Sequence, residues 1–191
     1  MKYKTVFTTP FFDIEAGIES ILGTTAEPYY RMTGSDSVIC CAMTVRGEFV
    51  MIKQYRPNIE RFTLELPAGG ISNDENPVDA ARREFAEETS LKCEFVALGD
   101  FKLMMNRTNI REHIFFGLNP SIDPCASQES GIEVVFVKRT KLIEYSLAGG
   151  YKQLAGLGVI QLASNYLGLD ILREPMDVIF EQFNMRVNYE G

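Results

Sequence analysis

A short acidic helix is predicted in the middle of the chain, and it constrains the fold more than any other segment. Asn76 and Pro77 suit the N-cap and the first position of a helix, and three apolar residues between 78 and 85 recur at helical spacing. We expect the helix to run to about Thr89. Segments typical of strands lie before and after it, so the helix has to pack on a sheet built from both sides of the chain.

The strand-like segments predict a mixed β-sheet. Residues 38–45 and 49–52 are apolar runs separated by a turn that contains glycine, which indicates a hairpin. Residues 62–66 alternate like a third strand. The remaining elements expected are strands at 93–101, 112–118 and 132–138 and a helix at 152–167. This order predicts an α+β fold, an α/β/α sandwich with a mixed β-sheet between helices.

The length of 191 residues suits one domain with an extension. Residues 1–35 mix threonine, aromatic residues, glycine and proline, and we interpret them as an N-terminal arm or hairpin that forms a dimer. Residues 36–170 form the main domain, and residues 171–191 are interpreted as a C-terminal tail.

Composition excludes several classes of function. The net charge of −7 argues against nucleic acid as a partner. With His113 as the single histidine, a zinc site of two or three histidines cannot be built in one chain. The four cysteines, without a CxxC pair, are interpreted as buried residues in a reducing compartment. The chain shows no secretory signal, and its longest apolar stretch is about half of the ~18 residues that span a bilayer. We therefore expect a cytoplasmic protein without a membrane partner.

The end of the predicted helix carries an unusual cluster of carboxylates. Glu84, Glu87 and Glu88 are three and four residues apart, so they share one side of the helix. Like charges repel at this spacing, and the helix C-terminus disfavours anions. A bound Mg²⁺ or Mn²⁺ would reverse both effects, because these cations prefer carboxylate oxygens. The alternative is a solvated helix face neutralised by Arg82 and Arg83.

Residues 69–91 resemble the Nudix box, G-x5-E-x7-R-E-U-x-E-E-x-G-U, in which U is a bulky apolar residue. Six of its seven fixed positions match, namely Gly69, Glu75, Arg83, Glu84, Glu87 and Glu88. Ser90 stands where the family has glycine, and Phe85 replaces the usual aliphatic residue. Glycine after a helix normally takes a left-handed conformation, so we expect Ser90 to cost about 1 kcal/mol.

The resemblance extends beyond the box. Residues 54–56 and 64–69 look like the segment that leads into the box in ADP-ribose and nucleotide-sugar pyrophosphatases of this superfamily. Residues 128–134 are similar to the acidic loop before the last strand there, and the similarity spans about residues 36–165. The loop at 106–111 departs from the Pro-Gly loop that is common in ADP-ribose enzymes.

The resemblance implies a hydrolase that cleaves a nucleoside diphosphate linked to another moiety, with water and divalent cations. Glu84 and Glu88 would be the principal ligands of Mg²⁺ (Mn²⁺ is the alternative), Glu87 a further ligand, and the carbonyl of Ala68 would complete the site. Arg83 would orient these carboxylates. Glu87 and Arg83 are thereby also assigned to the catalytic set.

Further roles follow by position. Gly69 and Glu75 would be structural residues of the box. Glu129 is the preferred general base, and Glu133 is the next candidate and a possible substrate contact, although either acid can be a solvated loop residue.

Cationic residues complete the implied substrate site. Arg56 and Arg61 would hold the diphosphate, and Arg107 and Arg111 would contact the leaving group; the alternative for each is a surface cation. A lone histidine such as His113 more often has a structural role.

The expected substrate is a small nucleotide, ADP-ribose or a nucleotide sugar first. Open alternatives are GDP-mannose, a dinucleoside polyphosphate or a coenzyme A derivative on the same fold, and a non-catalytic sensor of nucleotide ligands. A homodimer is implied only by analogy with the relatives.

Overall fold

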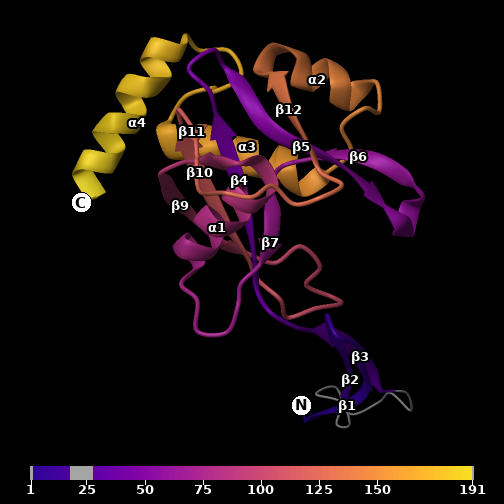
Figure 1. Cartoon of the computed structure of the whole chain (residues 1–191). Coiled ribbons are helices and arrows are strands. Elements are labelled where there is room, and N and C mark those ends of the chain that lie inside the picture. The colour runs from indigo at the N-terminus through magenta and orange to yellow at the C-terminus, as the bar shows by residue number, and fades with distance from the viewer. Residues whose placement is uncertain (1, 18–27, 191) are drawn as a thin grey trace.

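The computed structural model describes residues 2–17 and 28–190. Its main body is a mixed β-sheet between two layers of helices (Figure 1). β10 runs parallel to β4, and the other pairs along the sheet are antiparallel. The strand order is β12(Glu133–Lys138), β5(Glu48–Arg56), β4(Ser37–Met43), β10(Glu112–Leu118) and β9(Phe95–Phe101). The predicted α+β sandwich and the predicted hairpin are confirmed.

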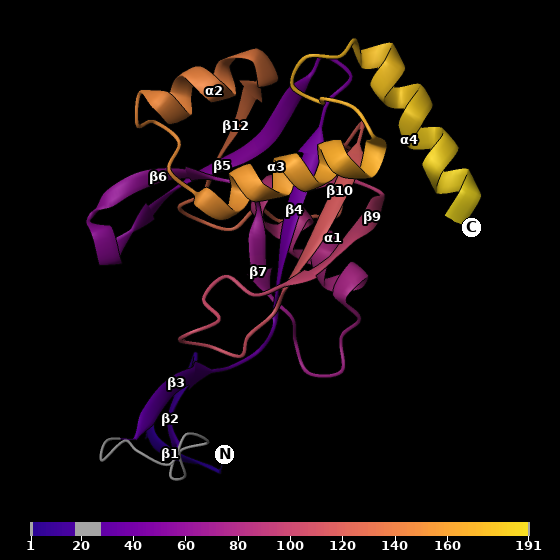
Figure 2. The same ribbon diagram turned by 180° about the vertical axis from the view of Figure 1, so that it is seen from behind.

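Alternate residues of β4 pack against the two helical layers. Its even-numbered residues pack with Phe85 of α1(Pro77–Thr89) on one face. Its odd-numbered core residues pack with Val159 and Ile160 of α3(Leu154–Leu167) on the other face. Figure 2 shows α3 lying across that second face. The strand is therefore apolar throughout because both of its faces are covered.

Two helices were not predicted from the sequence. α2(Arg139–Leu147) follows β12 directly, and α4(Met176–Glu190) occupies the segment that the sequence analysis interprets as a tail. Leu142 of α2 and Ile179 of α4 are buried in the core on the α3 face. Residues beyond 170 therefore pack against the main body.

The sheet divides next to β4. β4 and β5 form only two residue pairs, Ala42 with Val50 and Met43 with Phe49. Beyond them β6(Arg61–Glu65) pairs with β5, and β7(Ala68–Gly70) pairs with β4. The other short elements are η1(Pro57–Ile59), β8(Leu91–Lys92) and β11(Ser121–Ile122).

The N-terminal strands form a separate antiparallel sheet that projects from the main body in both ribbon views. It consists of β1(Tyr3–Thr8), β2(Asp13–Gly17) and β3(Tyr29–Thr33), in that order. The Met32 N–H donates to the Arg107 carbonyl at 2.7 Å and so ties the arm to the loop before β10. Residues 1, 18–27 and 191, which also fall in the predicted arm and tail, lie outside the described residues.

Three of the four cysteines are buried, but Cys125 is exposed, so the expectation that all four are buried was wrong. Cys125 lies in a loop where its N–H donates to the Asp123 carboxylate at 2.9 Å. This local turn keeps the residue at the surface. Among the described residues, no helix is long and apolar enough to cross a membrane.

Candidate active site

The candidate active site lies where α1 meets β7. At Gly69 a side chain is impossible without movement, because an added Cβ would lie 2.1 Å from the carboxyl carbon of Glu84. The glycine therefore lets the helix carboxylate approach the strand backbone directly. This contact explains the first fixed position of the box.

Arg83 organises the acidic groups around this contact. Its Nε and Nη2 donate to both oxygens of Glu75, each at 2.8 Å. Nη1 donates to Glu84 at 2.7 Å and to Glu87 at 3.2 Å, and Nη2 also reaches the Gly70 carbonyl at 3.0 Å. One guanidinium thus fixes the loop before the helix, the strand and two helix carboxylates.

Glu75, in the loop before α1, is held strongly in its charged form. The hydrogen bonds from Arg83, together with the Ser72 N–H at 2.9 Å, lower the pKa of Glu75 to about 2. The role that the resemblance implies for Glu75, a structural partner in the loop, agrees with these contacts.

Glu88 is the most buried acid of the cluster, with 5% of its surface exposed. One of its oxygens accepts the Ala68 N–H at 2.9 Å. Burial raises the pKa of Glu88 to about 8, the nearby charges of Glu84 and Glu129 act in the same direction, and the Ala68 hydrogen bond opposes them. A buried carboxylate of this kind does not by itself stabilise the fold, whereas a cation beside it would stabilise its charged form.

The loop that carries Glu129 is attached to the end of α1. The Glu129 N–H donates to the Glu87 carbonyl at 2.7 Å. The Gln128 side-chain amide donates to the carbonyls of Glu88 and Ile132 at 3.2 and 3.1 Å. The exposed Glu129 side chain is therefore held near the helix carboxylates, and its charge raises the pKa values of Glu84 and Glu88.

Arg56 and Glu65 form a paired site on the strands that face this loop. Arg56 donates two hydrogen bonds to Glu65, at 2.8 and 2.6 Å. Burial by itself would raise the pKa of Glu65, but the hydrogen bonds from Arg56 and Thr63 bring it below its usual value. Glu88 and Glu129 also help to raise the pKa of Arg56, which places the guanidinium near the acidic cluster.

Sequence reasoning missed Glu65. In the alternating segment 62–66 this residue shares the polar phase with Thr63, which predicts an exposed side chain, whereas the structure buries it. A buried acid of this kind needs a partner, and Arg56 is nine residues away on the neighbouring strand.

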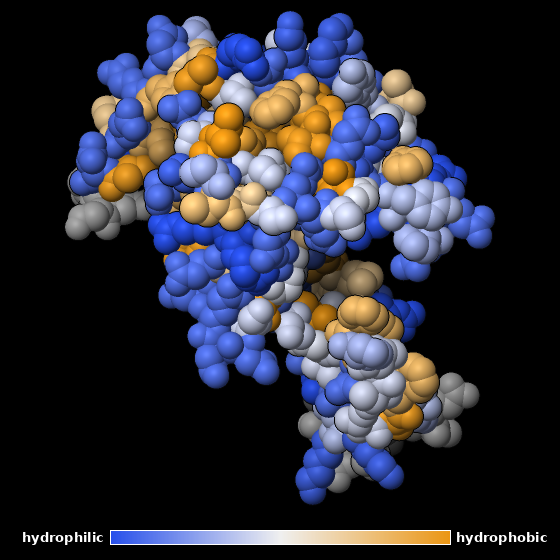
Figure 3. All heavy atoms as spheres, viewed as in Figure 1, coloured by the Kyte–Doolittle hydropathy of each residue, from blue (hydrophilic) through white to orange (hydrophobic). Residues whose placement is uncertain are grey.

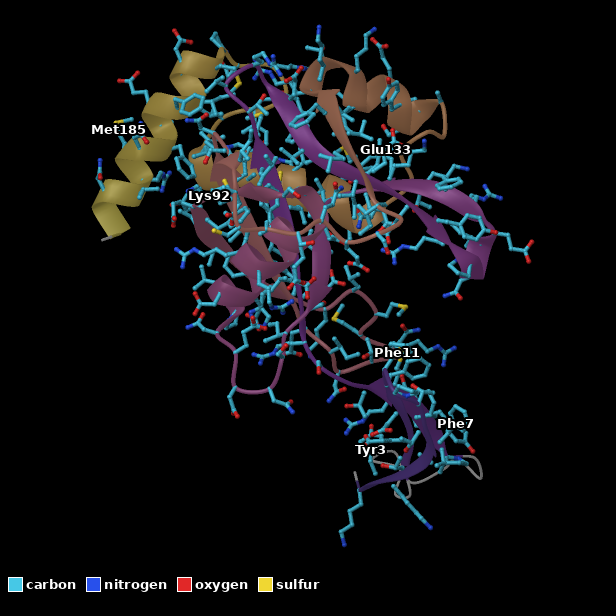
Figure 4. The ribbon with its side chains drawn as sticks, viewed as in Figure 1. Tyr3, Phe7, Phe11, Lys92, Glu133 and Met185 are labelled. Carbon is cyan, nitrogen blue, oxygen red and sulfur yellow. The ribbon has the colours of Figure 1, made fainter. Side chains whose placement is uncertain are left out.

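Arg61, Glu133 and Arg107 make contacts outside the acidic cluster. Arg61 donates to the Ile59 carbonyl at 3.3 Å and lines a cavity of about 460 Å³ beside β6. Glu133 forms an exposed ion pair with Lys53 at 2.9 Å on β12 and β5, and Figure 4 labels it there. Arg107 is exposed on the loop that holds the arm.

Arg111 and His113 both lie against the carboxylate of Asp36. Arg111 pairs with Asp36 at 2.8 Å and with Asp100 at 3.2 Å. The ring nitrogen of His113 lies 3.6 Å from the same Asp36 carboxylate. Both side chains therefore lie against one acid, directly before β4.

Ser90 ends α1 in the left-handed conformation, with φ of 57°. Its N–H donates to the Ala86 carbonyl at 2.8 Å. The backbone thus has the shape expected for the box glycine, although the side chain differs.

The donor set suits a hard cation, although the groups are not assembled as a metal site. Within the described part of the chain, no three acidic, histidine or cysteine side chains are grouped closely enough to hold a metal ion. The available oxygens belong to Glu84, Glu88 and the Ala68 carbonyl, and the exposed side chain of Glu87 is next to them. Carboxylate and carbonyl oxygens are the ligands that Mg²⁺ and Mn²⁺ take.

Comparison with known proteins identifies the family. The model of the NUDIX domain matches residues 35–153. The chain belongs to the NUDIX family. Its Nudix box is the segment that builds the arrangement of Gly69, Arg83 and Glu88.

Three curated relatives match parts of this NUDIX chain. It is 41% identical over 64 residues to the methanol dehydrogenase activator of Bacillus methanolicus, which covers 34% of each chain. It is 42% identical over 53 residues to the ADP-ribose pyrophosphatase of Bacillus subtilis (strain 168), covering 28% of this chain and 29% of that one. It is 47% identical over 45 residues to the ADP-sugar pyrophosphatase of Mus musculus, covering 24% and 21%. The matches therefore span about a third of these relatives or less.

The fold is also shared with a solved structure. The crystal structure of an ADP compounds hydrolase superposes with a TM-score of 0.73 at 17% sequence identity, covering 88% of this chain and 92% of that chain. The similarity supports the same mixed sheet between helices.

Proposed function

We propose that this NUDIX chain is a pyrophosphohydrolase that depends on a divalent metal and acts on a nucleoside diphosphate linked to another moiety, with ADP-ribose or a nucleotide sugar as the preferred substrate. The observation that carries the proposal is the buried Glu88 carboxylate beside the Ala68 backbone, in a cluster that Arg83 keeps in order. The names of two relatives, an ADP-ribose and an ADP-sugar pyrophosphatase, support the substrate class.

The cluster would hold Mg²⁺ through Glu84, Glu88 and the Ala68 carbonyl, with Glu87 as a further ligand. When bound, the cation supplies charge neutralisation of the pyrophosphate and a more acidic water. Arg83 keeps Glu84 in place and prevents repulsion from moving it away from the strand. Arg56, fixed by Glu65, presents its remaining N–H groups to the diphosphate.

Glu129 is the proposed general base. Its carboxylate accepts the proton of the water whose oxygen attacks a phosphorus atom. The phosphoanhydride bond then breaks, and the products are a nucleoside monophosphate and the phosphorylated second moiety. Glu129 is exposed and held near the end of α1 by its own N–H, so it is free to reach a water at the cluster.

The test is hydrolysis of a panel of compounds with and without Mg²⁺: ADP-ribose, ADP- and GDP-sugars, dinucleoside polyphosphates and NADH. Glu88→Gln should lower turnover by about 10²–10³-fold. Glu94→Gln is the matched control, because that exposed glutamate pairs only with Arg82 at the surface. Turnover that survives in Glu88→Gln would contradict the metal assignment.

A direct binding measurement separates metal loss from misfolding. Mn²⁺ should raise the melting temperature of the wild-type chain and of Glu94→Gln, but not that of Glu88→Gln. Without metal, Glu88→Gln should melt no lower than the wild type, because the change removes a buried carboxylate. Tight binding of one nucleotide without any turnover would favour the alternative of a sensor.

We also propose a homodimer formed through the N-terminal arm. The arm exposes apolar residues, including Phe7 on β1 and Phe11 in the turn between β1 and β2, which are 60% and 86% exposed. Figure 4 labels both on the projecting sheet, and Figure 3 shows apolar residues on its surface. Large apolar side chains exposed together on one part of a molecule are typical of an interaction surface.

A further inference from the structure

An apolar cavity of about 370 Å³ lies on the α3 face of the sheet. Phe101 of β9 and Ile114 of β10 line it from the sheet, and Leu154, Val159 and Leu162 of α3 line it from the helix. The carboxylate cluster belongs to α1, on the opposite face. None of the residues assigned to hydrolysis above lines this cavity.

Glu112 is the one charged residue that lines the cavity. Its Oε2 is buried and accepts no hydrogen bond, and it is the one buried side-chain nitrogen or oxygen in that situation among residues 2–17 and 28–190. Burial also raises the pKa of Glu112. An unpartnered buried oxygen costs folding free energy, so its presence calls for a ligand or another explanation.

The cationic residues nearest to Glu112 in the sequence form ion pairs or hydrogen bonds with other groups. Arg111 is paired with Asp36 and Asp100. Lys102 donates to the Asn109 carbonyl at 2.6 Å.

Local structure holds Glu112 at the wall of the cavity. Glu112 is the first residue of β10, where it is paired with Phe101 of β9 and Ser37 of β4. On the helix side, Gly158 lines the cavity, and a Cβ added there would meet no atom within 4 Å. The missing side chain leaves open space on the helix side of the cavity.

We propose that this cavity is a binding site for a compact apolar group that carries an N–H donor, with the Glu112 carboxylate turning toward the cavity to accept that hydrogen. The apolar walls suit a ring, and the carboxylate suits an amine or an amino group on that ring. Phosphate groups are excluded, because they would be repelled by Glu112 and find no donors on the walls. The volume falls within the range of small-molecule pockets, about 300–1,000 Å³.

Two sources can supply such a group. Gly70 is paired with Ser37, and Ser37 with Glu112, so Glu112 lies two strands from β7. At about 4.8 Å between strands, the backbones of Glu112 and Gly70 are ~10 Å apart in the plane of the sheet. The group is either the base of a nucleotide whose phosphates reach the cluster, an identification that rests on the proposed function, or a separate small amine.

Paired probes test the site by calorimetry, which needs no turnover. Benzylamine is compared with toluene, and 9-methyladenine with 9-methylpurine, so that each pair differs in the amino group. For at least one pair, the amino compound should bind the wild-type chain about 10- to 100-fold more tightly than its partner. Glu112→Leu should abolish this difference, and Gly158→Leu should block binding by filling the cavity. Glu94→Leu, a change of the same kind at the surface, should leave it intact.

The outcomes are distinct. Absence of binding in the wild-type chain, or an amino-group preference that persists in Glu112→Leu, would overturn the proposal. Glu112→Leu should melt at or above the wild-type temperature, since an unpaired buried oxygen is removed.

The two sources of the ligand are distinguished by hydrolysis. Binding of 9-methyladenine that raises the KM of a hydrolysed nucleotide assigns the cavity to the substrate base. Binding that leaves hydrolysis unchanged assigns it to a separate amine. Either result supports the site, and the calorimetric test of binding does not depend on finding a hydrolysed substrate.

Discussion

At the scale of single residues, the candidate site depends on how completely Arg83 is used. All three of its nitrogens donate, and they reach the loop before α1, the strand β7 and two helix carboxylates. A lysine would supply one point of charge in place of a planar group with five donors. The arginine of the box is therefore required by geometry as well as by charge.

The two candidate bases can be separated by substitution. Glu129→Gln should lower kcat by about 10²–10⁴-fold, the usual contribution of a general base, because its loop is attached to the end of α1. Glu133→Gln should have little effect, because that side chain is paired with Lys53 at the surface. Steady-state kinetics on the substrate found in the panel checks both variants, and a larger loss in Glu133→Gln would reverse the assignment.

The Glu75 contact predicts a pH dependence of stability. The pKa of Glu75 is about 2 in the folded chain, below its ordinary value of 4.5. The unfolded chain therefore binds more protons between these values, and the stabilisation by Glu75 is present above pH 4.5 and lost as the pH falls toward 2. Urea denaturation at several pH values should show the wild type more stable than Glu75→Gln at pH 6, with the difference shrinking at pH 3. A constant difference would contradict the assigned contact.

At the scale of elements, the sequence predicts α1 and α3 well, whereas α2 and α4 were not predicted. The Asn76 side chain accepts the Val78 N–H at 3.0 Å, as an N-cap does, and the helix ends at Thr89 as predicted. In α4, by contrast, apolar residues occur on both sides: Ile179 is buried, whereas Val178 and Met185 are exposed. The sequence of α4 therefore lacks a clear helical period of apolar residues, because the side of the helix that faces solvent also carries apolar residues.

The site shows the same division between local and distant information. The box residues could be predicted because their roles depend on spacing within one helix and its preceding loop. The pairing of Arg56 with Glu65 depends on the register of β5 and β6, which sequence does not supply. The position of Glu112 depends on how α3 crosses the sheet, so neither its burial nor its missing partner could be predicted.

The end of α1 provides a test of local strain. Ser90 has a left-handed backbone, which costs a residue with a side chain more than it costs glycine. Ser90→Gly should therefore stabilise the chain by about 0.5–1 kcal/mol. Ser146→Gly, within the helix α2, should destabilise it by a similar amount. The midpoints of denaturant unfolding measure both changes, and equal signs would contradict the interpretation.

The packing of α4 can be tested in the same way. Ile179 is fully buried in the core on the α3 face. Ile179→Ala should lower the free energy of unfolding by about 2–5 kcal/mol. Val178→Ala, at the adjacent exposed position, should change it by about 0.5 kcal/mol or less. Similar effects for the two variants would mean that α4 does not pack as described.

At the scale of the whole molecule, the projecting arm predicts the state of association. Phe7→Ser combined with Phe11→Ser should shift the chain from dimer to monomer, because the exposed apolar surface of the arm is reduced. Leu147→Ser is the control, since Leu147 is 85% exposed on α2 and outside the arm. Sedimentation velocity distinguishes the species, and a wild-type chain that sediments as a monomer would contradict the proposed dimer.

The divided sheet has a consequence for how such a protein can change. β4 and β5 share two residue pairs, and beyond these pairs Arg56, Glu65 and Ala68 lie on the strands that border the division. Arg56 and Glu65 belong to neither of the buried apolar layers on the two faces of β4, and Ala68 is only partly buried against the layer on the α3 face. Substitutions along that border can alter what is recognised while the helical layers keep the chain folded, so specificity and stability are encoded in separable sets of positions.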